Sequence, residues 1–159
     1  MLLVLPLNPV PASRPRVARN GRVFYAKTYA NFKKQAETVV PTAIEMQELR
    51  GCPLEGHLMV DLRFFSKRPK KTILRFPRYD TDNSAKACLD ICNGKLWLDD
   101  DQVVVLTATK SWAEPEQDGW IEVRVEPYWT DDELDGGANA NPNKTHSRTP
   151  TNWQDNLTR

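Results

Sequence analysis

Apolar residues recur along the first 129 residues with two different periods, and each period predicts one kind of element. Apolar and polar side chains alternate from Leu58 to Phe64, which is typical of a strand with one buried face. A spacing of i, i+3, i+4 and i+7 is typical of a helix with one buried stripe, and the stretch from Ala85 to Cys92 follows it. The pattern predicts strands at residues 2–8, 54–65, 102–112 and 120–128, and helices at residues 28–49 and 82–93.

Turn residues and proline refine this order of elements. Asn20-Gly21 is a strong two-residue turn signal and predicts a β-hairpin that joins residues 16–19 to residues 22–25. Pro41 interrupts the apolar stripe of the first helix and predicts a kink or a break there. The expected fold is therefore α+β, a single small domain with about four strands in a mixed or mostly antiparallel sheet and two main helices.

The last thirty residues differ from the rest in composition. Residues 130–159 are dominated by Asp, Asn, Gly, Thr and Pro, and their only large apolar residues are Leu134, Trp153 and Leu157. Such a segment cannot bury enough surface to offset the entropy of ordering it. The prediction is a folded domain at residues 1–129 and a polar tail, disordered or loosely attached, at residues 130–159.

Overall composition is that of a soluble globular protein, with 40% hydrophobic and 27% charged residues. No apolar run reaches the length of a membrane helix, and the short apolar start lacks a basic region before it, so neither a membrane span nor a signal peptide is expected. The odd count of three cysteines favours reduced thiols and a cytoplasmic location. Cys88 and Cys92 lie on the expected apolar stripe and are interpreted as core residues.

Charge is distributed unevenly although the formal net charge is only +1. Residues 14–34 contain seven basic side chains and residues 63–78 contain seven more, and neither stretch contains an acidic one. Local basic patches, rather than net charge, attract a phosphate backbone. The alternative is ordinary solvated surface charge on two loops.

The candidate chemistry lies in residues 80–104, where acidic side chains flank the second helix. Asp80 and Asp82 precede it, with Asp82 as the expected N-cap, and Lys86 lies on the helix. Three carboxylates follow the helix at Asp99, Asp100 and Asp101. Two like charges about 4 Å apart repel by about 1 kcal/mol in water and about 4 kcal/mol at an effective dielectric of 20.

Such a group of carboxylates requires protonation, wide spacing or bound cations. Clustered carboxylates suit Mg²⁺, and a nearby lysine suits a phosphate, so the set suggests metal-assisted phosphodiester hydrolysis. The alternative is structural: the first pair as turn and cap residues, and the later three as a solvated acidic turn.

The same residues resemble a known family. The sequence Asp80-Thr81-Asp82-Asn83, then Lys86 and Asp90, then Trp97-Leu98-Asp99-Asp100 and Gln102-Val103-Val104, closely resembles the RusA family of Holliday junction resolvases. The resemblance implies a homodimeric, Mg²⁺-dependent endodeoxyribonuclease that resolves four-way DNA junctions by paired symmetric nicks in recombination and repair, with Mn²⁺ expected to substitute. By position, the matches to the family's essential acidic residues are Asp80, Asp82 and Asp100, and the match to its active-site lysine is Lys86. Because three aspartates are adjacent, Asp99 and Asp101 remain alternatives for sharing the metal, with Asp99 included in the expected ligand set.

The resemblance extends to the first basic stretch, and the second leads directly into Asp80, where it would bring a phosphate backbone up to the cations; both are expected to contact the DNA backbone without reading sequence. The expected contacts are Arg14, Arg16, Arg22, Lys27, Lys67, Arg68, Lys70, Lys71, Arg75 and Arg78. Two other classes stay open: a non-catalytic branched-DNA-binding protein of the same fold, and a protein whose carboxylates hold a structural cation.

Overall fold

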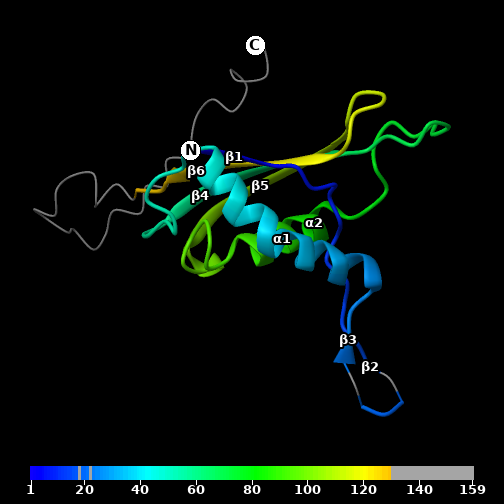
Figure 1. Cartoon of the computed structure of the whole chain (residues 1–159), viewed down its shortest axis with the longest axis horizontal. Coiled ribbons are helices and arrows are strands. Elements are labelled where there is room, and N and C mark those ends of the chain that lie inside the picture. The colour runs from blue at the N-terminus through cyan, green and yellow to red at the C-terminus, as the bar shows by residue number, and fades with distance from the viewer. Residues whose placement is uncertain (18, 22, 130–159) are drawn as a thin grey trace, which may run out of the picture. The chain divides into compact units, whose positions relative to one another are not determined.

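The structure is a computed structural model, and it describes residues 1–17, 19–21 and 23–129. Residues Met1–Tyr128 form one compact unit (Figure 1). The predicted tail at residues 130–159 and the predicted DNA contact Arg22 lie outside the described residues. Neither helix found in the described ranges combines the length and apolar character that a membrane crossing requires.

The centre of the unit is a four-stranded sheet with the order β1-β6-β4-β5. Its strands are β1 (Leu2–Leu5), β4 (Leu58–Ser66), β5 (Val103–Trp112) and β6 (Trp120–Pro127). β6 runs antiparallel to both β1 and β4, whereas β4 and β5 are parallel. The sheet is therefore mixed, and with its two α-helices it confirms the α+β fold class.

The predicted hairpin is present as a separate two-stranded ribbon. β2 (Arg16–Val17) pairs with β3 (Val23–Phe24), and the ribbon projects away from the sheet (Figure 1). In the described residues the register pairs Arg16 with Phe24 and Val17 with Val23. The hydroxyl of Ser13 accepts a hydrogen bond of 3.1 Å from the backbone N–H of Ala26 and ties the two ends of the ribbon together.

Both helices cover the same face of the sheet. α1 spans Lys27–Met46 and α2 spans Thr81–Cys92 (Figure 1). On β4 every second side chain, from Leu58 to Phe64, is buried under the helices, as the alternation predicts. The opposite face is polar: Asp61 pairs with Arg63 at 3.1 Å and accepts a 2.6 Å hydrogen bond from Thr107.

α1 continues through Pro41 as one helix, so a break at that position was a wrong expectation. Proline removes one backbone donor, but Val40 and Ala43 on either side of it are buried in the core and hold the helix together. At the end of α1, Gln47 bonds the edge strand β1: its amide donates to Val4 O (2.7 Å) and its carbonyl accepts from Val4 N (2.9 Å).

α2 is the crossover between the two parallel strands β4 and β5, and it packs against the core through small side chains. Ala85, Cys88 and Cys92 are buried, which confirms the interpretation of the two cysteines as core residues. Gly94 then turns the chain with φ of +69°, a conformation that glycine adopts without strain. Trp97 follows it into the core and fixes the place from which the second acidic group begins.

Candidate active site

The first acidic group lies where α2 begins. Asp80, not Asp82, is the N-cap residue: its backbone is extended (ψ of 132°) and its carbonyl accepts the first helical hydrogen bond, 3.2 Å from Ser84 N. The expectation that Asp82 caps the helix is wrong, because Asp82 already belongs to the first turn. The Asp80 carboxylate accepts a 3.2 Å hydrogen bond from the side chain of Asn83 and leaves the backbone donors of the first turn uncapped.

The polar face of α2 continues with Lys86 and Asp90, each four residues further on. Residues at this spacing are neighbours one turn apart, about 5.4 Å along the helix axis. The Lys86 ammonium lies 3.8 Å from a carboxylate oxygen of Asp90. The other oxygen of Asp90 accepts a 2.7 Å hydrogen bond from the hydroxyl of Tyr29 on α1. Burial, the Asp90 hydrogen bond and its charge raise the pKa of Tyr29, so the phenol stays protonated and donates.

The second acidic group forms a short 3₁₀ helix, η1 (Asp100–Gln102), with Asp99 as its N-cap. The Asp99 side chain accepts from Asp101 N (3.2 Å), and Gln102 accepts from Asp99 N (2.9 Å), which makes a capping box. Gln102 also donates to the carbonyls of Leu54 and Gly56. The Asp99 side chain therefore stabilises the start of η1, whereas Asp101 is exposed to solvent.

Asp100 is the carboxylate of this group that feels the charges of α2. Burial contributes most to the raised pKa of Asp100, the hydrogen bond and charge of Asp99 and the charge of Asp90 raise it further, and Lys86 lowers it. Asp100 on η1 and the Lys86–Asp90 pair on α2 therefore form one electrostatic site. Negative charge there exceeds the positive charge of the single lysine.

The structure thus brings Asp100, the neighbour of Asp99, within electrostatic reach of Lys86 and Asp90, and it places Asp82 one turn before Lys86 on the same helix. It does not gather the predicted acidic residues into a closed cage: among the described residues, no three or more Asp, Glu, His or Cys side chains form a group that could hold a metal ion. The oxygen-only chemistry of the set fits a hard cation that keeps several of its waters.

Two residues of this site were not singled out from the sequence. Asp90 was noted on the polar face of the helix and in the family motif, but not as a site residue. Tyr29 was assigned to the apolar stripe of α1, and its ring is indeed buried. Nothing in the sequence indicates that its hydroxyl reaches Asp90, 61 residues away.

The basic residues have different surroundings in the two stretches. Arg14 and Lys27 are exposed near the ribbon, and Arg16 lies in β2. In the second stretch, Lys67 pairs with Asp118 at 2.6 Å and Lys70 approaches Glu116 at 4.0 Å. Four further basic side chains of this stretch are exposed: Arg68, Lys71, Arg75 and Arg78.

The two ion pairs arise because the turn between β5 and β6 lies beside the loop that follows β4. Gly119 makes this approach possible: a Cβ there would lie 2.2 Å from Asn8 Oδ1 and 2.7 Å from the carbonyl oxygen of Phe65. The hydrogen bond to Asp118 contributes most to the raised pKa of Lys67, and the charge of Asp118 raises it further. The second basic stretch contains no acidic residue, but two acidic residues of the neighbouring turn lie beside its lysines.

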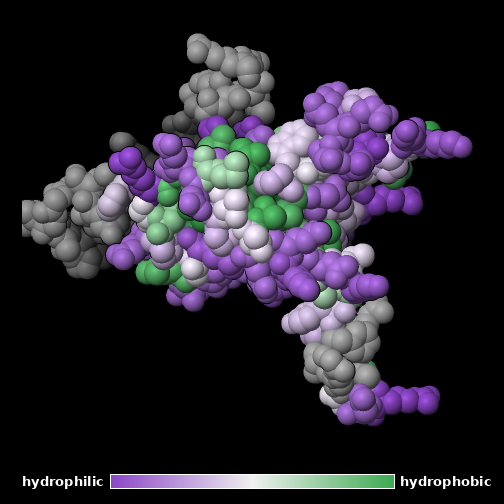
Figure 2. All heavy atoms as spheres, viewed as in Figure 1, coloured by the Kyte–Doolittle hydropathy of each residue, from purple (hydrophilic) through white to green (hydrophobic). Residues whose placement is uncertain are grey.

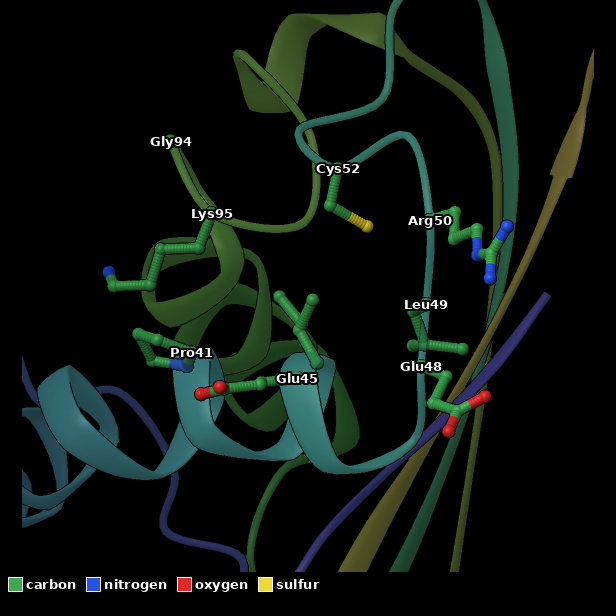
Figure 3. A pocket seen from close by; sticks show the side chains of 9 residues that line it. Pro41, Glu45, Glu48, Leu49, Arg50, Cys52, Gly94 and Lys95 are labelled. Carbon is green, nitrogen blue, oxygen red and sulfur yellow. The ribbon is translucent and has the colours of Figure 1, made fainter.

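A cleft of about 570 Å³ lies apart from the acidic residues (Figure 3). It is formed by the end of α1, the loop after it and the turn after α2, and Cys52 projects into it. Its charged residues are of both signs, Glu45 and Glu48 with Arg50 and Lys95, and Lys95 is bonded to the carbonyl of Ile91 at 3.2 Å. The cleft shares no residue with the acidic site.

Comparison with protein families gives one match to this architecture. Residues 6–126 match the family described as endodeoxyribonuclease RusA. The match covers the ribbon, both helices and all the acidic residues described above. No curated protein matches the chain.

Proposed function

Because the chain belongs to the RusA family of endodeoxyribonucleases, we propose that it resolves four-way DNA junctions by paired symmetric nicks in a Mg²⁺-dependent reaction, in DNA recombination and repair. One observation carries the proposal. Asp100 lies close enough to Lys86 and Asp90 for their charges to act on it, in a site whose negative charge one lysine only partly offsets. Such a site suits a cation and a phosphate together.

The residues that would hold Mg²⁺ are Asp80, Asp82 and Asp100, with Asp99 as a further donor. Mg²⁺ commonly takes one or two protein carboxylates and fills its remaining positions with water and phosphate oxygens, so an open set of carboxylates fits it. Mn²⁺ shares the preference for oxygen donors and is expected to substitute. The bound cation would supply a water of lowered pKa and offset charge on the phosphate.

The chain's own groups have separate tasks in this proposal. Lys86 holds its ammonium beside the phosphate, where it offsets the charge that develops on the non-bridging or leaving oxygen. Asp90 limits the positions of that ammonium through the 3.8 Å contact, and Tyr29 in turn fixes Asp90. The exposed basic residues of the two loops neutralise phosphates further along the backbone.

A homodimer is part of the proposal, since paired nicks in two equivalent strands need two sites related by a two-fold axis. β5 supports it. This strand pairs only with β4 in the described sheet, so one of its edges is open. Val104 and Leu106 on β5 are exposed and give that edge apolar surface that a second copy would cover.

The test is cleavage of a synthetic four-way junction in Mg²⁺ by the wild type and Asp82→Asn, with a linear duplex and a chelator as controls. Paired nicks in the junction alone, lost with the chelator and in Asp82→Asn while junction binding persists, would support the proposal. Tight junction binding without nicks in Mg²⁺ or Mn²⁺ would favour a non-catalytic branched-DNA-binding protein instead. Absence of both binding and nicks would refute both functions.

A further inference from the structure

The loop between β4 and α2 exposes two apolar side chains to water. Ile73 is 98% exposed and Phe76 is 51% exposed. Burial would stabilise side chains of this kind, and exposed apolar surface rimmed by polar residues marks interaction sites. Figure 2 shows the projecting loops as largely hydrophilic with small hydrophobic areas.

The exposure follows from how the loop is anchored. The indole N–H of Trp112 donates to the carbonyl of Leu74 at 2.9 Å, and Leu74 N bonds the hydroxyl of Thr72 at 3.2 Å. Pro77 is buried next to Phe76. The loop is therefore fixed through the backbone of Leu74 and the buried Pro77, while the side chains of Ile73 and Phe76 remain exposed.

The base of the loop is anchored as well. The hydroxyls of Ser66 and Tyr79 are 2.8 Å apart, and the ammonium of Lys110 donates to the carbonyl of Tyr79. Tyr79 directly precedes Asp80. The loop therefore holds its apolar residues at a limited distance from the acidic site.

The surroundings of the two apolar side chains are cationic. Lys70, Lys71 and Arg75 are exposed beside them, and the Arg75 guanidinium carbon lies 5.5 Å from the centre of the Phe76 ring. Apolar side chains surrounded by cations suit nucleic acid, in which base faces lie between phosphates. A duplex must be unstacked to offer a base face, whereas a branch point offers base pairs that lack a stacking neighbour.

The short chain between Phe76 and Asp80 limits how far the apolar side chains can lie from the acidic site. Asp80 is the fourth residue after Phe76, and four steps along the chain span at most about 14 Å when fully extended. That length corresponds to about four nucleotides at 3.4 Å each along one strand. A base held by Phe76 is thus within a few nucleotides of a phosphate held by the acidic site.

We propose that Ile73 and Phe76 pack against base faces exposed at the branch point of the DNA, and that this contact determines which phosphodiester reaches the acidic site. This inference rests on the proposed junction cleavage and adds the residues that set the position of the cut. Ile73 and Phe76 are positioning residues. They take no part in the hydrolysis.

The experiment uses the full chain and a four-way junction with 2-aminopurine at the branch point, whose fluorescence falls when a side chain stacks on its exposed face. Binding is measured in Ca²⁺ and cut positions in Mg²⁺, for the wild type, Ile73→Ser/Phe76→Ser and Phe76→Trp. The control is Met46→Ser at the end of α1, since Met46 is 79% exposed and lies on another element.

The wild type, Phe76→Trp and Met46→Ser are expected to lower the fluorescence and to cut at one position. The double variant is expected to leave the fluorescence unchanged, to spread its cuts over several positions, and to lose about tenfold of its preference for the junction over a duplex. Wild-type fluorescence and cut positions in the double variant would overturn the inference and leave the proposed function intact. A wild type that neither binds nor nicks the junction would overturn both.

Discussion

The acidic face of α2 and the basic loop after β4 are consecutive in sequence but differ in how their charges are held. On α2 two charged groups belong to one fixed network: Tyr29 donates a hydrogen bond to Asp90, and Asp90 contacts Lys86. On the loop, by contrast, four basic side chains are exposed, and the two that are paired contact exposed acids of a neighbouring turn.

The difference separates two kinds of functional dependence. A group fixed against the core acts from one position, so replacing it removes its contribution entirely. Exposed cations act through a shared field, so each replacement removes only a fraction of the affinity. We therefore expect large effects on cleavage from the acidic face and small, additive effects on binding from the loop.

The largest effect is expected for Asp100→Asn compared with Asp101→Asn. Asp100 lies close enough to Lys86 and Asp90 for their charges to act on it, whereas its neighbour is exposed. Loss of the Asp100 carboxylate should lower the rate of junction nicking by about 10³-fold, equivalent to several kcal/mol of transition-state stabilisation. Asp101→Asn should stay within about twofold of the wild type, as is usual for an exposed residue outside a site. Single-turnover nicking rates measure both, and equal losses would contradict the assignment of Asp100.

The next effect concerns the close approach of the two loops. Gly119→Ala places a Cβ within 3 Å of Asn8 Oδ1, the Phe65 carbonyl and Lys67 N. Two of these atoms belong to the backbone, so the clash can be removed only if the turn moves. The free energy of unfolding should fall by about 1–3 kcal/mol. Urea unfolding measures it, with Gln117→Ala in the exposed part of the same turn as the control; equal stability of the two variants would show that the turn adjusts freely.

A smaller effect is expected where the acidic face is anchored to α1. Tyr29→Phe removes the hydrogen bond to Asp90 and should lower the free energy of unfolding by about 1.5 kcal/mol, because the acceptor is charged. Tyr25→Phe changes an exposed residue whose ring packs against Tyr29, and the ring is kept. If both variants unfold at the same urea concentration, the hydrogen bond from Tyr29 to Asp90 contributes nothing to stability. The acidic face would then be held no more firmly than the basic loop.

The smallest effect is expected on the loop itself. Asp118→Asn removes the carboxylate 2.6 Å from Lys67 and leaves that lysine available to a phosphate. The slope of log K against log salt should become steeper by about 0.9 for one more neutralised phosphate, with little change in stability. Fluorescence anisotropy with a labelled junction at several salt concentrations measures the slope. Glu114→Gln, in the same turn and without an ion pair in the described ranges, should leave it unchanged.

The sequence predicts much of this arrangement because local spacing determines it. The alternation along β4 and the stripe on α2 depend on residues within one element, and both agree with the burial found. The acidic residues adjoin the ends of α2, so finding the helix also located them. The proximity of Asp100 to Lys86 was implied by the family motif and not by spacing.

What the sequence did not predict depends on contacts between distant segments. The bond from Tyr29 to Asp90 and the pairing of Lys67 with Asp118 arise only when the sheet order brings those elements together. Two aspartates two residues apart could each have capped α2, and the extended backbone at Asp80 decided between them. Proline in α1 indicated a break, but burial on both sides of it outweighed the lost hydrogen bond.

The two outer strands of the sheet end it differently, and this limits how copies of the chain can assemble. Gln47 occupies the backbone groups of Val4 on β1, whereas β5 has no such cover in the described structure. A sheet with two open edges can add strands from further copies without limit. A sheet with one open edge can pair with only one other copy, because that pairing covers the edge. A single glutamine at the end of a helix thus occupies, at one edge of the sheet, backbone groups that an added strand would need.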